Sequence, residues 1–137
     1  MSEITLIAAI GERGQLGLKG DMPWGRGFPD DLKRFREVTA GGVVIVGHRT
    51  WPSVQHLNGT HGRLFLVDDP LRTPHKFADD IAITFGNPEI FIAGGAKTFA
   101  RWMPRITAFD VTRLPFEGPA DVYADFLLPH VTRELAA

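Results

Sequence analysis

The 137-residue chain is predicted to form one α/β domain, with a central, mostly parallel twisted sheet flanked by helices. Short apolar runs alternate with helical or turn-rich stretches along the chain, which is the rhythm of strand-helix-strand units. Hydrophobic residues make up 44% of the sequence, enough for one core, and no linker or internal repeat divides it. Several apolar runs end at glycines, at the edge where such sheets bind ligands.

The predicted strands are runs of β-branched and other apolar residues. They cover residues 4–10, 43–46, 64–67, 81–85, 89–93 and 107–114. The run 43–46 is β-branched throughout, as expected for an internal strand of a parallel sheet. Residues 15–27 are rich in glycine and are expected to form a loop.

Helices are expected over residues 30–40, 49–54 and 96–103, with a short one over 74–79. The first places Leu32, Phe35 and Val38 on one side and ends at Gly41-Gly42.

Composition excludes several classes of function. The net charge of −1, without long charged blocks, argues against a nucleic-acid-binding surface. Cysteine is absent and the five histidines lack HxH or HExxH spacing, so neither a disulfide framework nor a metal site is expected. The apolar run 4–10 follows no basic segment and is too short to span a membrane, so we expect a soluble, cytoplasmic protein.

Asp31 is the strongest candidate functional residue. It follows Pro29 at a predicted helix start and precedes Phe35 by one helical turn, so both side chains leave one face. A carboxylate beside an aromatic ring, under the loop of Trp24, could hold a flat, nitrogen-rich heterocycle. Alternatively, Asp31 is only a helix-start acid and Phe35 only a core residue. The rival acid Asp30 lies about 100° around the helix and should face solvent.

Two predicted strand ends could bind phosphate. Gly94-Gly95 join a strand to a helix N-terminus, whose free N–H groups and positive dipole end suit an anion. Gly47 also follows a buried strand, and Arg49 and Thr50 could add a cation and a hydroxyl. Each stretch is equally explained as a tight turn or a capped short helix. Together they suggest a ligand with a diphosphate bridge, although GxGxxG is absent and a Rossmann site is not supported.

Five stretches, in this order and spacing, resemble the dihydrofolate reductase family over nearly the whole chain. They are Leu6-Ile7-Ala8-Ala9, Gly17 with Asp21-Met22-Pro23-Trp24, Pro29-Asp30-Asp31-Leu32 with Phe35, Gly47-His48-Arg49-Thr50-Trp51-Pro52-Ser53 and Ile92-Ala93-Gly94-Gly95-Ala96. The resemblance implies that family's fold and the NADPH-dependent reduction of 7,8-dihydrofolate to tetrahydrofolate. It further implies hydride transfer from nicotinamide C4 to pterin C6, protonation at N5, a monomer and a target for antifolates.

The same resemblance implies roles for individual residues. Asp31 matches the acid of the pterin pocket, Thr112 the hydroxyl that supports it, and Trp24 the residue that holds a water near the pterin. The other implied substrate-binding residues are Ile7, Ala8, Phe35, Val54, Leu57 and Arg63. Arg63 would pair with the carboxylate of the glutamate tail. Partial burial should raise the pKa of Asp31.

The implied cofactor-binding residues lie in a mobile loop over 16–22 and at strand ends. They are Ala9, Leu16, Gly17, Met22, Gly47, His48, Arg49, Thr50, Leu66, Asp68, Ala93, Gly94, Gly95, Ala96, Lys97, Thr98 and Phe99. Arg49 and Thr50 match contacts to the diphosphate, and His48 or Arg49, with Lys97, would meet the 2′-phosphate.

The chain departs from the family pattern at several points. Asp68-Asp69 stand where small hydroxyl residues are usual and would repel a 2′-phosphate, so NADPH and NADH both stay open. Phe99 replaces a tyrosine and Ala96 a third glycine. The chain stops at Ala137, so the closing C-terminal strand pair is expected to be missing or shrunken, exposing a sheet edge. A pyrimidine reductase of riboflavin synthesis and a non-catalytic folate- or nucleotide-binding module are the competing interpretations.

Overall fold

A computed structural model describes residues 3–135 and shows a six-stranded sheet in the order β4-β3-β5-β1-β6-β8. All neighbouring strands in this sheet run parallel. The strands are β1 Ile4–Ile10, β2 Gln15–Gly17, β3 Val43–Val46, β4 Leu64–Val67, β5 Ile90–Ile92, β6 Ala108–Arg113, β7 Val122–Tyr123 and β8 Arg133–Glu134. The α-helices are α1 Pro29–Thr39, α2 Trp51–Val54, α3 Pro74–Phe85 and α4 Ala96–Trp102. Short 3-10 helices are η1 Gln55–Leu57, η2 Thr60–Gly62, η3 Met103–Arg105 and η4 Asp125–His130.

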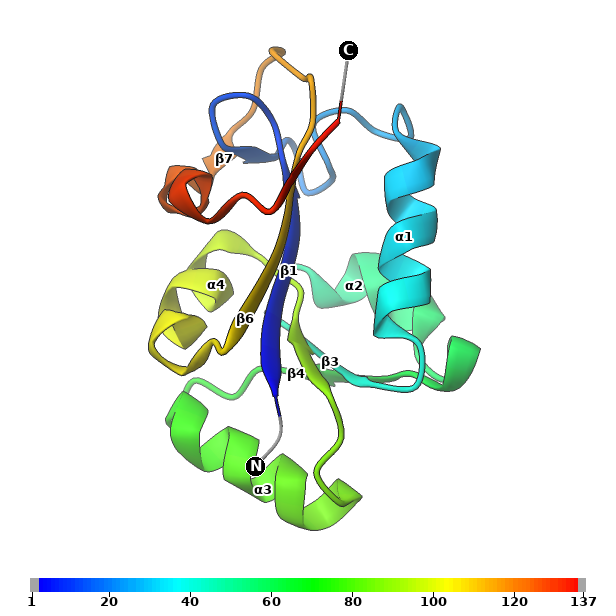
Figure 1. The fold of residues 1–137 in the computed structure, drawn as a ribbon, viewed down its shortest axis with the longest axis vertical. Coiled ribbons are helices and arrows are strands. Elements are labelled where there is room, and N and C mark those ends of the chain that lie inside the picture. The colour runs from blue at the N-terminus through cyan, green and yellow to red at the C-terminus, as the bar shows by residue number, and fades with distance from the viewer. Residues whose placement is uncertain (1–2, 136–137) are drawn as a thin grey trace.

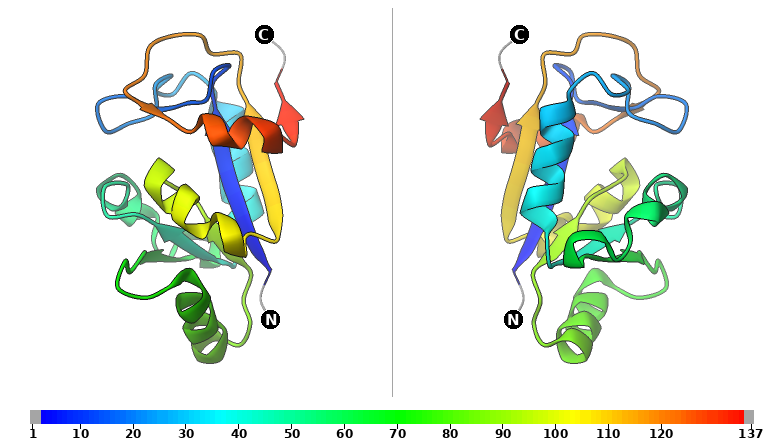
Figure 2. Two further views of the ribbon diagram at one scale, coloured as in Figure 1. Left: turned by 90° about the vertical axis from the view of Figure 1, so that its left-hand side faces the viewer. Right: turned by 90° about the vertical axis from the view of Figure 1, so that its right-hand side faces the viewer.

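Helices cover both faces of the sheet, which confirms the predicted α/β architecture. Figure 1 shows α1 and α4 on opposite sides of β1 and β6, and the side views of Figure 2 agree. Alternation along β3 supplies both layers, because successive strand residues point to opposite faces. Val43 and Ile45 join a core cluster with residues of α3 and α4, and Val44 packs in a second cluster beneath α1 and α2.

The prediction of a strand over 81–85 was wrong, since these residues form the second half of α3. Thr73 caps the helix by accepting a hydrogen bond from the Lys76 N–H, and Gly86 ends it in the left-handed conformation. Phe77 and Ile81 are one helical turn apart and both enter the core. The burial of this face outweighs the strand preference of the β-branched residues near the helix end. The helix predicted over 74–79 is present but extends to Phe85, and the other predicted strands and helices have ends that differ by at most two residues.

The loop predicted over 15–27 is wrong at its start, because residues 15–17 form β2 and pair antiparallel with β7. Gln15 is fully buried. Its side-chain amide donates to the Gly118 carbonyl at 3.1 Å, and its oxygen accepts from the Arg13 N–H at 2.7 Å. The bond to Gly118 ties the beginning of the glycine-rich segment to the chain after β6.

One edge of the sheet is the two-residue strand β8, the last strand in the described residues. It pairs parallel to the end of β6, with Thr112 opposite Arg133. Thr132 adds a further hydrogen bond between the two segments, because its hydroxyl accepts from the Val111 N–H at 2.9 Å. This pairing brings Arg133 to the carboxyl edge of the sheet. None of the helices in residues 3–135 is long and apolar enough to cross a membrane.

Candidate active site

Asp31 lies where α1 passes the carboxyl ends of β1 and β6. The two strands pair with Ala9 opposite Thr112, and the Asp31 side chain is only 15% exposed beside this point. Asp30 is exposed, as predicted, because it lies on another side of the same helical turn. Ile7 is buried, while Ala8 and Ala9 are partly buried along β1.

Four charged side chains alternate in sign around this point. Arg133 Nη2 lies 3.5 Å from Asp31 Oδ1 and also donates to the Thr112 hydroxyl. Arg133 Nη1 lies 3.6 Å from Asp110 Oδ1. Arg34 Nη2 donates to Asp110 Oδ2 at 2.6 Å. The two carboxylates and two guanidiniums therefore form one partly buried cluster that spans α1, β6 and β8.

Burial raises the pKa of Asp31 above the ordinary aspartate value, as the sequence suggested. Arg133 and then Arg34 oppose this rise by attraction, and the nearby Asp110 adds to it by repulsion. The Thr112 hydroxyl lowers the pKa slightly by a hydrogen bond. Because burial is the largest cause, the protonated form of Asp31 is favoured more than it would be in an exposed aspartate.

Aromatic side chains gather beside α1. Trp24 makes edge-to-face contacts with Phe28 at 6.2 Å and with Phe116 at 5.5 Å between ring centroids. Phe35, Val54 and Leu57 are partly buried against the core cluster on the α1 side, so the predicted substrate wall lies on that face. Trp24 remains partly exposed.

Arg63 is buried at 3% exposure, near the C-terminal end of α1. Its guanidinium donates to the Thr60 carbonyl at 3.0 Å, the Thr60 hydroxyl at 2.6 Å and the Thr39 hydroxyl at 3.4 Å. All of these partners are neutral. Burial and the neighbouring Arg36 lower the pKa of Arg63. A buried cation with only neutral partners is suited to an incoming anion.

The predicted cofactor residues at the ends of β3 and β5 do come together. The Gly47 N–H donates to the Gly94 carbonyl at 2.8 Å, and the Phe99 N–H donates to the Gly95 carbonyl at 2.9 Å. A Cβ on Gly47 would lie 2.5 Å from the Thr98 hydroxyl oxygen, so a larger residue there would require Thr98 to shift. The Gly94-Gly95 peptide is cis.

The flanks of this region differ in exposure. His48, Arg49 and Lys97 are exposed, while Thr50, Leu66, Ala93 and Ala96 are partly buried. Thr98 and Phe99 are buried, and Phe99 belongs to the core cluster under α4. In the glycine-rich segment, Leu16, Gly17 and Met22 are partly buried, and Leu18 bridges to Asp21 across a tight turn.

Asp68 and Asp69 do not face the glycine-lined strand ends as free charges. Arg101 pairs with Asp68 at 2.8 Å, and its second nitrogen donates to the Asp69 carbonyl at 2.7 Å. Arg72 pairs with Asp69 at 2.8 Å and with Asp80 at 3.0 Å. Hydrogen bonds from the Leu71 N–H and Arg72 hold the pKa of Asp69 below its usual value. The expected repulsion of a 2′-phosphate is therefore weakened by two arginines.

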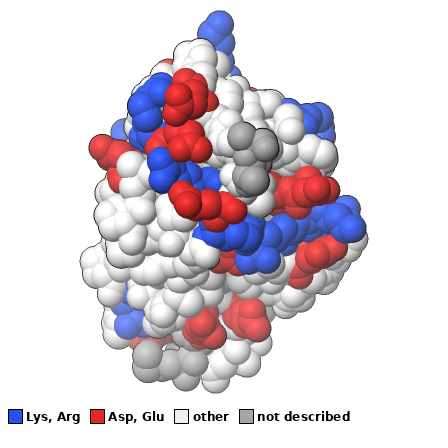
Figure 3. Space-filling view, turned by 45° about the horizontal axis from the view of Figure 1, so that its top comes forward, with Lys and Arg blue, Asp and Glu red and all other residues white. Residues whose placement is uncertain are grey.

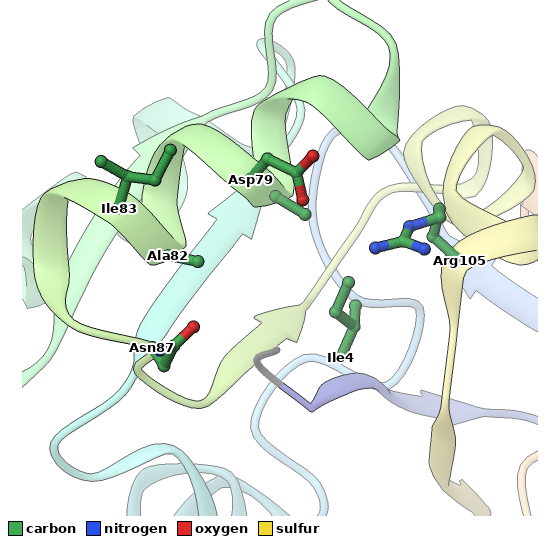
Figure 4. A pocket seen from close by; sticks show the side chains of 7 residues that line it. Ile4, Asp79, Ala82, Ile83, Asn87 and Arg105 are labelled. Atoms are coloured by element: carbon green, nitrogen blue, oxygen red, sulfur yellow. The ribbon is translucent and has the colours of Figure 1, made fainter.

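A hollow of about 270 Å³ lies between α3 and the beginning of β1, lined by Ile4, Asp79, Asn87 and Arg105 among others (Figure 4). It is at the amino end of β1, away from Asp31 and the glycines. Figure 3 shows Lys and Arg interspersed with Asp and Glu on the face in view. Among residues 3–135 no group of three or more acidic, histidine or cysteine side chains could hold a metal ion.

Sequence reasoning missed four residues of this region: Arg34, Asp110, Phe116 and Arg133. Arg34 could have been found, since it lies three residues after Asp31 on the same helix. Arg133 carries no local signal, because only the pairing of β8 with β6 brings it to Asp31.

The sequence was also compared with protein families and with known proteins. Residues 3–135 match the family model described as dihydrofolate reductase. The dihydromethanopterin reductase of Methylorubrum extorquens is 34% identical over 129 residues, which are 91% of this chain and 92% of that protein. The dihydrofolate reductase of Mycobacterium tuberculosis is 29% identical over 134 residues, covering 94% and 81% of the two chains. That of Neisseria meningitidis is 30% identical over 131 residues, covering 90% and 79%. The chain belongs to the dihydrofolate reductase family of oxidoreductases.

Proposed function

We propose that this protein catalyses the NADPH-dependent reduction of 7,8-dihydrofolate to 5,6,7,8-tetrahydrofolate, with hydride transfer to pterin C6 and protonation at N5. The observation that carries the proposal is the partly buried Asp31 carboxylate on the same helix that reaches Arg63. From Asp31 to Thr39, which contacts Arg63, the helix rises by about 12 Å. That span suits a molecule with a ring at one end and an acid at the other.

Asp31 would orient the ring. An ionised carboxylate only accepts hydrogen bonds, so it suits the 2-amino group and the ring N3–H of a pterin. Its negative charge favours a proton at N5, which makes the neighbouring carbon a better hydride acceptor. The raised pKa brings its proton exchange closer to neutral pH. Trp24 and Phe35 would cover the flat faces of the ring.

Arg63 would hold the acidic tail of the substrate. Three of its N–H groups are donated to threonine oxygens, so the remaining donors of the planar fork can take a carboxylate. Val54 and Leu57, from α2 and η1, would line the wall between ring and tail.

The ends of β3 and β5 fit a dinucleotide cofactor, because the glycines there let a ligand approach the backbone without meeting a side chain. A Cβ on Gly95 would lie 3.5 Å from the Thr50 hydroxyl oxygen, so this hydroxyl and the bare backbone share one cradle. NADPH bound there would supply the hydride. His48, Arg49 and Lys97 are the exposed cations that could meet its 2′-phosphate.

The test is a hydride-transfer assay with NADPH and dihydrofolate on wild type and two variants. Asp31→Asn removes the charge, and Asp30→Asn makes the same change on the exposed neighbour. We expect turnover to fall by at least about 100-fold in Asp31→Asn only, because the loss removes charge stabilisation in a partly buried site. Equal rates for wild type and Asp31→Asn, with both folded, would sink the assignment. Binding of NADPH and dihydrofolate without oxidation would instead favour a non-catalytic module.

A second substrate, dihydromethanopterin, is favoured by one observation. The relative described as dihydromethanopterin reductase is covered over 92% of its length, against 81% for the Mycobacterium tuberculosis enzyme, so it is similarly short. Comparing kcat/KM for the two dihydropterins decides between the two substrates. The same assay with NADPH and NADH fixes the cofactor.

We also propose that the enzyme works as a cytoplasmic monomer. The absence of cysteine suits a reducing compartment, because such a chain needs no disulfide. Light scattering at several protein concentrations would reveal any dimer.

A further inference from the structure

Arg133 occupies an unexpected place for a basic residue, directly beside the candidate substrate acid. Its strand, β8, is paired to β6 so that Arg133 lies opposite Thr112. From there its guanidinium reaches three acceptors: Asp31 at 3.5 Å, Asp110 at 3.6 Å and the Thr112 hydroxyl. The side chain is 28% exposed, so solvent screens it only in part. Arg133 is therefore held by two anchors besides Asp31.

The charged groups around Asp31 balance. Arg34 faces it from α1, Asp110 from β6 and Arg133 from β8, and the uncharged Thr112 lies between them. Two carboxylates and two guanidiniums give a local formal charge of zero. Without Arg133, the same cluster would carry a net negative charge.

We propose that Arg133 is a specificity-determining residue, which lets the site accept a ring that offers Asp31 two neutral N–H donors and makes it disfavour a ring whose positive charge lies at the atoms that contact Asp31. The proposal rests on the assignment of Asp31 as the substrate-binding acid. A cationic ring bound to Asp31 would share that carboxylate with Arg133, so two positive charges would lie close together in a partly buried site.

A neutral ring does not meet this obstacle. A carboxylate has several lone pairs, and Arg133 uses one Asp31 oxygen at the long distance of 3.5 Å. The remaining lone pairs can accept from an amino group and a ring N–H. Arg133 has little freedom to move away, because Thr112 and Asp110 hold the same guanidinium.

Two probes that differ in ring charge test the proposal. One is 7,8-dihydrofolate, whose 2-amino-4-oxo ring is neutral. The other is a 2,4-diaminopyrimidine, measured at a pH at which its ring is protonated. Dissociation constants for both are determined by tryptophan fluorescence or calorimetry on wild type, Arg133→Gln, Arg133→Lys and Arg113→Gln. Arg113 is the matched control, since it lies on the same sheet edge but pairs with Glu12 and Glu134.

We expect Arg133→Gln to shift the ratio of the two affinities toward the cationic probe by at least about tenfold. Arg133→Lys keeps the positive charge and should keep the wild-type ratio, and Arg113→Gln should also leave it unchanged. A merely structural role of Arg133 would weaken both probes alike. An unchanged ratio in Arg133→Gln overturns the proposal, as does an equal shift in Arg113→Gln.

Asp31→Asn separates this inference from the proposed function. If it weakens both probes while Arg133→Gln leaves the ratio unchanged, the substrate-binding acid stands and the specificity role falls. If Asp31→Asn leaves both affinities unchanged, the assignment of the acid falls, and the specificity role with it. Should Arg133→Gln fail to fold, Arg133→Met tests the same loss of charge, and thermal unfolding of each variant shows which can be used.

Discussion

Replacement of Arg63 by methionine gives the sharpest test of how a substrate lies along α1. Methionine keeps most of the length and volume of the side chain but has no charge and no N–H donor. Because Arg63 is 3% exposed and its partners are threonine oxygens, the fold does not depend on an ion pair there. Removing the Arg63 charge therefore leaves no partner charge buried and unpaired, which is the usual cost of replacing a buried ionised residue.

The magnitude follows from the contacts that a carboxylate would gain. Hydrogen bonds to charged groups contribute roughly 1.5–3 kcal/mol each. Loss of one such bond raises KM by roughly 10- to 100-fold, since about 1.4 kcal/mol corresponds to a factor of ten. The turnover number should change little, because the bond is made equally in the ground state and the transition state.

The assay combines two enzymes and two substrates. Steady-state rates are measured for wild type and Arg63→Met with dihydrofolate and with a dihydropterin that lacks the acidic tail. The KM for dihydrofolate should rise in Arg63→Met, and that for the tail-less dihydropterin should not. Arg36→Met is the control, because Arg36 is an exposed neighbouring cation. An equal rise for both substrates would refute the placement of the tail at Arg63.

Three further changes have defined outcomes. Because burial raises the pKa of Asp31, its ionised form lowers stability once the pH exceeds the unfolded value of 3.8, and the loss grows until the pH passes the folded pKa. Asp31→Asn should thus have a higher melting temperature than wild type at about pH 7 but not at about pH 3, as measured by circular dichroism. A variant that melts higher at about pH 3 and lower at about pH 7 would contradict the direction of this pKa shift. Gly47→Ala places a Cβ 2.5 Å from the Thr98 hydroxyl and should cost about 1–3 kcal/mol and weaken NADPH binding, with partial rescue by Thr98→Ala. Asp68→Asn leaves Arg101 without its carboxylate partner and should lower the free energy of unfolding by about 1–3 kcal/mol in urea titration.

The strands could be predicted because buried parallel strands leave continuous apolar runs in the sequence. Residues 43–46 and 64–67 were placed with the bounds that the structure has. The run 81–85 misled because Ile81, Ile83 and Thr84 prefer strands locally, while the helical spacing of Phe77 and Ile81 only gains its meaning from the core that they share.

The candidate site likewise contains residues that the sequence could predict and residues that it could not. Asp31 and the glycines at the strand ends lie in compact local motifs, so their positions could be predicted from sequence. Arg133 lies 102 residues from Asp31 in the chain and reaches it through a strand of two residues. No periodicity can reveal so short a strand, and its pairing depends on long-range contacts with β6.

The charges at the two ends of α1 are unequal, and this inequality narrows the substrate class. At the start of the helix, Arg133 already balances Asp31, so that end suits a neutral ring. At its far end, Arg63 is a buried cation with neutral partners, so that end suits an anion. A neutral donor ring joined to an acid over about 12 Å satisfies both ends at once. A free pterin would leave Arg63 without an anion, and an acid alone would leave without donors the Asp31 lone pairs that Arg133 does not use. The pattern therefore favours a tailed pterin over either fragment, and it predicts that the two fragments together bind more weakly than the joined molecule.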